Sequence, residues 1–83
     1  MRVISQDGKS DIPYEYFSLS VASGKCSDVE YACIYCHNIS APHCTKIAEY
    51  SSKEKALKAM EALRETYMHP YIRYFQFPKD SEV

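Results

Sequence analysis

Four cysteines and two of the three histidines lie in one stretch of the chain, and thiols and imidazoles offer the widest side-chain chemistry. This stretch, residues 26–44, contains Cys26, Cys33, Cys36, His37, His43 and Cys44. A tetrahedral zinc site needs four such ligands, and the candidates are Cys33, Cys36, His43 and Cys44. A thiol of Cys36 or Cys44 beside His43 would instead form a nucleophile and its base.

The order Cys33, Cys36, His37 also has the spacing of a haem attachment motif and of a redox dithiol. Haem attachment requires export, whereas the chain opens without an apolar signal stretch. A redox dithiol requires a helix that begins at its first cysteine, whereas a polar segment follows here. If residues 29–36 form a regular strand, Cys33 and Cys36 face opposite ways and cannot share a metal ion. We therefore expect free buried thiols and no cofactor, with zinc as the alternative.

Catalysis has little support elsewhere in the chain. Neighbouring residues of a strand point to opposite faces, so His43 and Cys44 would not meet on one surface. The sequence has only two glycines, too few for a phosphate-binding glycine-rich loop. We expect a protein that is not an enzyme.

Aromatic residues and one arginine gather in residues 71–77, where Tyr71, Arg73 and Tyr74 could stack and neutralise a single-stranded nucleic acid. Aromatic side chains in a strand beside a helix more often supply the core. Ten basic and eleven acidic residues give a net charge of −1, which provides no general attraction for nucleic acid. Nucleic-acid binding is therefore an alternative and not the expectation.

Strand patterns occupy the first fifty residues. Residues 2–6 are followed by a hairpin turn at Asp7 and Gly8. Residues 12–21 alternate between apolar and polar side chains but change phase midway, which predicts a bulge or corner, with Pro13 on a sheet edge. A turn at residues 23–25 and strands at 29–36 and 45–50 follow, in a register that pairs Cys36 with Cys44.

One helix is predicted over residues 52–68, because its apolar side chains recur at helical spacing. Ser51 and Glu54 have the spacing of a capping box, Glu54 and Lys58 that of an ion pair, and Pro70 ends the helix. Residues 71–77 form the last strand. The expected core residues are Ile4, Tyr14, Phe17, Leu19, Ile34, Ile47, Ala56, Met60, Leu63, Tyr67 and Phe75.

These elements predict a single α+β domain over residues 1–83, with an antiparallel sheet of about four to five strands packed against one helix. One helix covers one face of such a sheet. Tyr31, Cys33, Tyr35 and Ile47 would share one face, and neither face is clearly polar. We expect the uncovered face to mediate homodimerisation or binding of a protein partner through Tyr31 and Tyr35.

Four segments of the chain carry a resemblance to a known group of proteins. They are residues 2–8, 11–15, 48–56 and 75–78. Together they resemble small uncharacterised proteins of bacteriophages, prophages and mobile elements of Gram-positive bacteria. The resemblance implies a cytoplasmic accessory protein with no catalytic residues to transfer. The longest apolar run, residues 31–36, is far too short for a membrane span, so we expect no membrane association.

Overall fold

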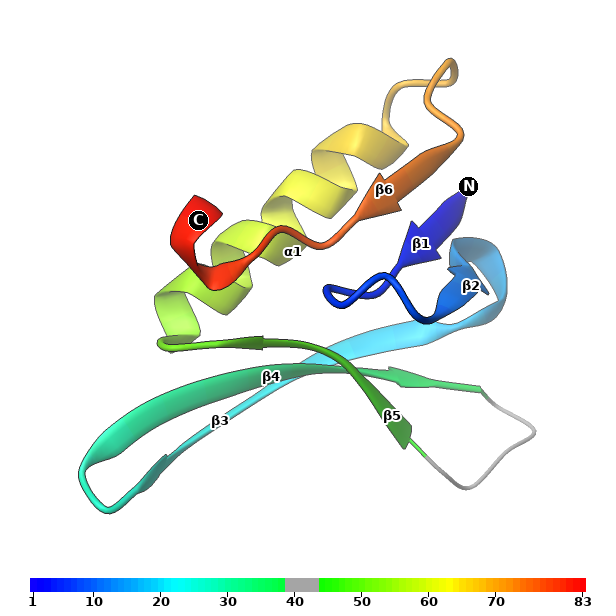
Figure 1. Ribbon diagram of the computed structural model, residues 1–83. Helices are drawn as coiled ribbons and strands as arrows, with labels where there is room; N and C mark the ends of the chain where they lie inside the picture. The colour runs from blue at the N-terminus through cyan, green and yellow to red at the C-terminus, as the bar shows by residue number, and fades with distance from the viewer. Residues whose placement is uncertain (39–43) are drawn as a thin grey trace.

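The computed structural model describes residues 1–38 and 44–83 of the chain (Figure 1). In chain order the elements are β1 (Arg2–Ile4), β2 (Asp11–Pro13), the 3₁₀ turn η1 (Tyr14–Tyr16), β3 (Ser18–Cys26), β4 (Val29–His37), β5 (Cys44–Tyr50), α1 (Lys53–Tyr67), β6 (Tyr74–Gln76) and the 3₁₀ turn η2 (Asp80–Glu82). His43, one of the candidate zinc ligands, lies outside the described residues.

The described strands form two sheets of three strands each. One has the order β2-β1-β6 and the other the order β3-β4-β5. The α+β class is confirmed, but the prediction of one antiparallel sheet with four to five strands is wrong. There are six strands in the described part of the chain, and β6 runs parallel to β1. In Figure 1, α1 lies over the β3-β4-β5 sheet, and the β2-β1-β6 sheet, whose strands are shorter, lies beside α1.

The first hairpin follows its sequence signal. Gly8 has φ of 77°, and β1 and β2 pair antiparallel on either side of the turn. The Asp7 carboxylate accepts hydrogen bonds from Ser5 Oγ at 2.6 Å and from the Lys9 N–H at 2.9 Å. β2 is an edge strand, so the predicted edge position of Pro13 is confirmed.

The phase change within residues 12–21 marks the passage from one sheet to the other. Instead of a bulge in one strand, η1 separates β2 from β3. Ile12 and Leu19 both contact the core, although they belong to different sheets. The pattern therefore indicated the corner correctly, and a 3₁₀ turn provides it.

The hairpin between β3 and β4 turns later than predicted. Gly24 lies within β3, and the turn consists of Ser27 and Asp28, with φ of 50° and 66°. Two left-handed residues suit a two-residue hairpin loop. A Cβ atom on Gly24 would lie 2.9 Å from the Tyr31 hydroxyl, so Gly24 makes room for the tyrosine ring across the ladder. The predicted turn at residues 23–25 is wrong for this reason.

β4 and β5 pair in a register one residue away from the prediction. His37 lies opposite Cys44, and Cys36 lies opposite Thr45. The register shifts between Ile34 and Tyr35, leaving Ile47 as the extra residue of β5. This bulge turns Ile47 into the core, away from the tyrosine face where alternation alone had placed it.

The helix begins and ends close to the predicted residues, but its cap is different. The Ser52 hydroxyl, not that of Ser51, accepts the capping hydrogen bond from the Lys55 N–H at 3.2 Å. Glu54 and Lys58 form the predicted ion pair. Among residues 1–38 and 44–83, no helix combines the length and apolar composition that a membrane crossing requires.

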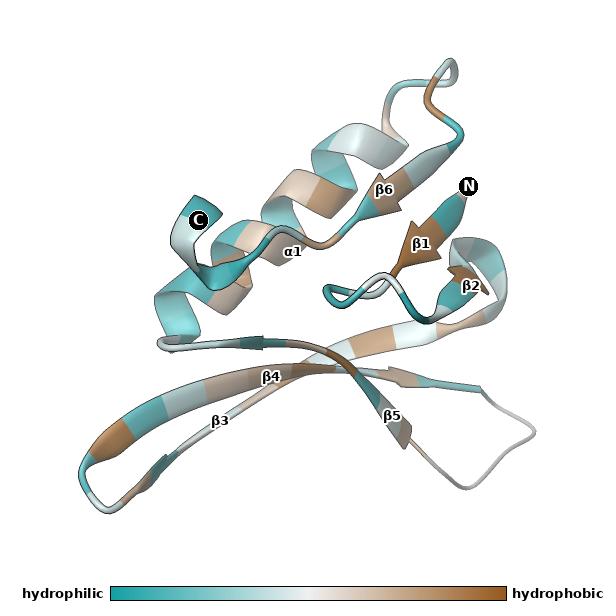
Figure 2. Cartoon of the chain, viewed as in Figure 1, coloured by the Kyte–Doolittle hydropathy of each residue, from teal (hydrophilic) through white to brown (hydrophobic). Residues whose placement is uncertain are grey.

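The core lies between α1 and the two sheets (Figure 2). Its predicted members Ile34, Ile47, Ala56, Met60 and Leu63 are buried. Tyr67 is exposed, and the remaining predicted members, Ile4, Tyr14, Phe17, Leu19 and Phe75, are half-buried. The prediction missed several fully buried side chains, which include Val3, Tyr50 and Phe77.

Replacing Leu63 with Ala tests the helix face. Leu63 is fully buried, so the variant should lose about 2–4 kcal/mol of unfolding free energy in urea titration. The matched control is Leu57→Ala, because Leu57 is 45% exposed on the same helix and its truncation should cost about 0.5 kcal/mol or less. Equal losses at the two positions would contradict this packing.

Candidate interaction site

The cysteines lie on different faces of the β3-β4-β5 sheet. Cys36 is buried in the core, where burial raises the pKa of its thiol, and Cys33 points to the face away from α1. Cys44 lies opposite His37 on that outer face, exposed to solvent. Cys33 and Cys36 therefore cannot bind one metal ion. We expected buried thiols, and Cys33 and Cys36 are buried, whereas Cys26 and Cys44 are exposed. The described residues contain no cluster of three or more metal-ligating side chains.

Cys33 belongs to a small polar network on the outer face. Its thiol lies 3.7 Å from Glu49 Oε1, and Lys46 Nζ lies 3.2 Å from the same oxygen. A hydrogen bond with Cys33 raises the pKa of the Tyr35 hydroxyl. The carboxylate raises the pKa of Lys46, so this ammonium group keeps its proton. The Cys33 thiol and the Lys46 ammonium group thus both have an acceptor in Glu49, which is typical of a cluster that stabilises the fold.

Sequence reasoning missed one contact of a nucleophile with a base. Ser20 Oγ and His37 Nε2 are 2.8 Å apart, although the residues are 17 positions apart in the chain. The pairing of β3 with β4 brings them onto one face. A serine nucleophile also needs an oxyanion-binding pair of N–H groups and a substrate cleft, whereas Ser20 and His37 lie on an open sheet face. The contact does not by itself define an active site.

Tyr31 and Tyr35 occupy the outer face, as predicted. Tyr31 is 41% exposed and lies across Gly24, while Tyr35 is half-buried beside Cys33. Each ring thus already has an intramolecular contact. Their role in binding stays a prediction.

Among the exposed side chains of residues 1–38 and 44–83, the largest apolar group lies in residues 68–74, which we call the aromatic loop. Tyr71 is 91% exposed, Met68 is 79% exposed and Tyr74 is 63% exposed. Ile72 and the preceding Tyr67 are also exposed. In Figure 1 this segment protrudes from the body of the molecule beyond the end of α1. Such a concentration of apolar surface is typical of a binding site.

Hydrogen bonds hold both ends of the aromatic loop. The His69 N–H donates to the Thr66 carbonyl at 3.1 Å, and the Ile72 N–H donates to the His69 carbonyl at 3.2 Å. At the other end the Arg2 N–H donates to the Arg73 carbonyl at 2.9 Å. The structured part of the predicted last strand is therefore shorter than residues 71–77, because only Tyr74–Gln76 pair with β1.

The charge of the aromatic loop has one sign. Arg73 is exposed, and the sequence between Met68 and Pro78 contains no carboxylate. Tyr71, Arg73 and Tyr74, the candidates for nucleic-acid binding, are all exposed in this segment. The predicted strand over residues 71–77 included Tyr71 and Arg73, which precede β6, whereas Tyr74 belongs to it. The exposure of this segment was missed because alternating aromatics also describe a buried strand.

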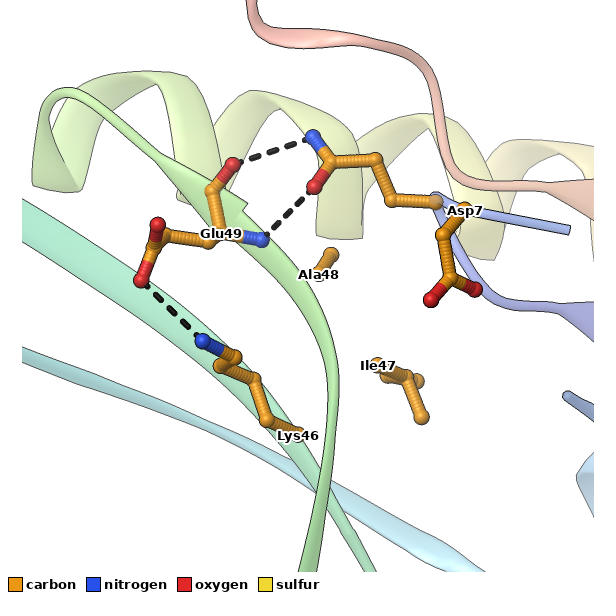
Figure 3. A pocket seen from close by; sticks show the side chains of 6 residues that line it. Asp7, Lys46, Ile47, Ala48 and Glu49 are labelled. Carbon is orange, nitrogen blue, oxygen red and sulfur yellow. Dashed lines mark hydrogen bonds and ion pairs between the residues drawn. The ribbon is translucent and has the colours of Figure 1, made fainter. Parts of the chain in front are cut away.

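A glutamine side chain connects the two sheets. Gln6 Nε2 donates to the Glu49 carbonyl at 3.0 Å, and Gln6 Oε1 accepts from the Glu49 N–H at 3.0 Å (Figure 3). The Gln6 N–H donates to the Ile47 carbonyl at 2.8 Å. The amide therefore satisfies the edge of β5 as the backbone of another strand would. A shallow hollow of about 200 Å³ lies here, lined by Gln6, Asp7, Lys46, Ile47, Ala48 and Glu49.

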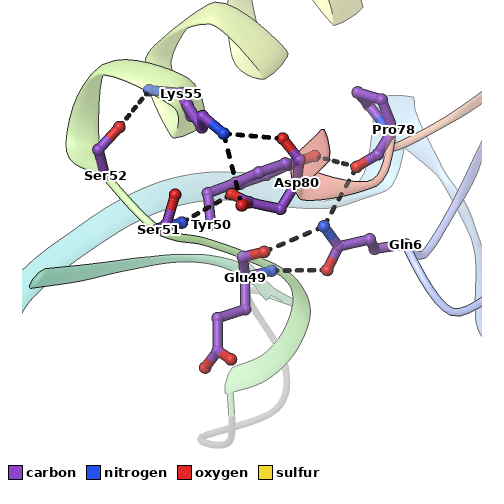
Figure 4. Close-up of polar contacts among 8 residues, drawn as sticks. All are labelled: Gln6, Glu49, Tyr50, Ser51, Ser52, Lys55, Pro78 and Asp80. Carbon is purple, nitrogen blue, oxygen red and sulfur yellow. Dashed lines mark hydrogen bonds and ion pairs between the residues drawn. The ribbon is translucent and has the colours of Figure 1, made fainter. Parts of the chain in front are cut away.

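The C-terminal segment completes this junction (Figure 4). Gln6 Nε2 also donates to the Pro78 carbonyl at 3.1 Å, and the buried Tyr50 hydroxyl donates to the same carbonyl at 2.7 Å. Burial raises the pKa of Tyr50. Asp80 accepts from the Ser51 N–H at 2.8 Å and pairs with Lys55, and these contacts lower its pKa.

No protein-family model, curated protein or solved structure matches the chain. The resemblance to phage proteins therefore stays a prediction.

Replacing Gln6 with Glu tests the junction. The carboxylate would face the Glu49 and Pro78 carbonyls without a proton to donate, which should cost about 1–3 kcal/mol of unfolding free energy at pH 7. Protonation restores a donor, so the deficit relative to wild type should shrink as the pH falls toward 4 in urea titrations. Leu57→Glu is the control, since it adds a carboxylate at an exposed helix position and removes no hydrogen-bond donor. A deficit independent of pH would contradict the donor role.

The lowered pKa of Asp80 predicts a pH dependence of stability. A carboxylate whose pKa is lower in the folded state stabilises above its unfolded pKa, near 4, and loses this effect as the pH falls. Thermal unfolding of the wild type should therefore shift to lower temperature below about pH 4. Asp80→Asn should show a shallower shift, whereas Asp28→Asn in the hairpin turn should follow the wild type. Parallel curves for Asp80→Asn and wild type would rule out this contribution.

Proposed function

We propose that the protein is a non-catalytic interaction module whose aromatic loop binds a protein partner. The observation that carries the proposal is the gathering of exposed Met68, Tyr71, Ile72 and Tyr74 in one anchored segment. Tyrosine and methionine are enriched at protein interfaces, because large polarizable side chains bury much area and adapt to a partner. The anchoring hydrogen bonds at both ends reduce the ordering cost of binding.

The partner surface follows from the chemistry of this segment. Apolar side chains need an apolar groove, and exposed Arg73 favours a carboxylate at the rim of that groove. In the setting that the sequence resemblance implies, the partner would be a bacterial or phage protein in the cytoplasm. The outer sheet face with Tyr31 and Tyr35 remains a second proposed contact surface.

Nucleic-acid binding is the alternative function, since Tyr71 and Tyr74 flank Arg73 and no acidic residue lies within the segment. The formal net charge of −1 favours a protein partner instead. Zinc binding in the cysteine stretch has less support, because Cys33 and Cys36 lie on opposite faces.

The test compares a double variant, Met68→Ser with Tyr71→Ser, with the wild-type protein. Affinity purification from the bacterial cells that express it should retain a partner on the wild type, and the variant should bind that purified partner at least about tenfold more weakly. Both side chains are exposed, so unfolding free energy should change little.

Val29→Ser is the matched control, because Val29 is 65% exposed and begins β4. The hairpin between β3 and β4 lies far from the aromatic loop (Figure 1), so this variant should leave binding unchanged. Equal affinity of wild type and double variant would contradict the assignment. Tight binding of single-stranded DNA or RNA that weakens steeply with salt would favour the alternative function.

A further inference from the structure

The two sheets have four edges, and three of them carry features that block pairing with another chain. β2 has three residues and ends in Pro13, and β6 has three residues. β5 is closed by the backbone and side chain of Gln6. Short strands, proline and covering groups are the usual protection of sheet edges against association.

The fourth edge, β3, lacks these features. It has nine residues and no proline, and Lys25 is its one charged residue. It pairs with β4 at every position from Ser18 to Cys26 without a register shift. In the described part of the chain, its backbone hydrogen bonds all go to β4. An edge strand leaves the outward half of its N–H and C=O groups available to another strand.

We propose that β3 pairs antiparallel with β3 of a second copy of this chain, joining two three-stranded sheets into a continuous sheet of six strands. A two-fold axis at Ala22 would place Ala22 opposite Ala22, and Ser20 opposite Gly24 of the second copy. Small side chains would thus meet small side chains along the outer face. On the other face, half-buried Leu19 and Val21 would gain cover.

The charges are compatible with a second copy. In this register Lys25 lies opposite Leu19, and the two Lys25 residues are about 20 Å apart along the strands, beyond the screening length of about 8 Å. The formal net charge of −1 leaves little repulsion between whole molecules. A pairing limited to one strand per copy buries little area, so the dimer should form only at high protein concentration.

The pairing would also give the tyrosines of the outer face a shared surface. Ser20, Ala22 and Gly24 lie directly opposite Tyr35, Cys33 and Tyr31 of the same copy. Ser20 and Ala22 of two adjoining β3 strands would therefore form the floor of a trough, with the Tyr31 ring of each copy lying across Gly24 at one of its ends. This surface is separate from the aromatic loop, so the dimer and the proposed function can fail independently.

The test places charges on the two-fold axis. Sedimentation velocity of the wild type from micromolar to millimolar concentration should show the mass rising from 9.6 kDa toward twice that value. Ala22→Glu alone and Ala22→Lys alone should each weaken self-association at least about tenfold, because like charges would lie directly opposite. An equimolar mixture of the two variants should associate at least as strongly as the wild type.

Leu57→Glu is the control, since it adds the same charge on an exposed helix position and should associate like the wild type. Circular dichroism would verify that the Ala22 variants fold. If they do not, hydrogen exchange of the wild type decides, because the amides of β3 should exchange more slowly at high concentration while those of β5 do not change. A wild type that stays at 9.6 kDa, or charged variants that associate as it does, would overturn the proposal.

Discussion

The fold depends on how the outward N–H and C=O groups of β5 find hydrogen-bond partners, because the structure describes no further strand beside β5. The Gln6 amide provides such partners by accepting from the Glu49 N–H and donating to the Glu49 carbonyl, as a peptide unit would. Because Gln6 lies two residues after the end of β1, this contact fixes one sheet against the other. The same amide reaches the Pro78 carbonyl, so three distant segments meet at a single side chain. The bulge at Ile47 lies at this contact and turns an apolar side chain inward.

Local patterns predicted the helix and its buried face, because the spacing of Ala56, Met60 and Leu63 reflects a single geometry within one segment. The cap shows where local reasoning ends. Ser51 has the better capping spacing, but its N–H is bound by Asp80, 29 positions later, and Ser52 caps the helix instead. The turn at Gly8 and the edge position of Pro13 could also be predicted from the sequence, since a left-handed turn favours glycine and a sheet interior excludes proline.

The division into two sheets could not be predicted from the sequence, because it rests on contacts between distant residues. Nothing near β6 indicates that it runs parallel to β1, or that Val3, rather than Ile4, is buried. Residues 71–73 were misassigned to a strand for a related reason, since their apolar side chains suit a core and only the tertiary structure leaves Tyr71 in solvent. The placement of Cys33 and Cys36 on opposite faces could be predicted, because alternation along a regular strand alone determines it.

The parallel pairing of β1 with β6 has a consequence for how the protein is made. Gln6 and Pro78 are 72 positions apart, and Val3 shares its core with Phe77. On the ribosome, β1 is made first, and β6 begins 70 positions after β1 ends, so the β3-β4-β5 sheet and α1 are all synthesised before the first sheet can be completed. Until then, β1 would have neither its parallel neighbour nor the aromatic side chain that covers it. Synthesis is therefore a period in which half-made chains expose apolar strands, and their long contact separations favour slow completion of the fold.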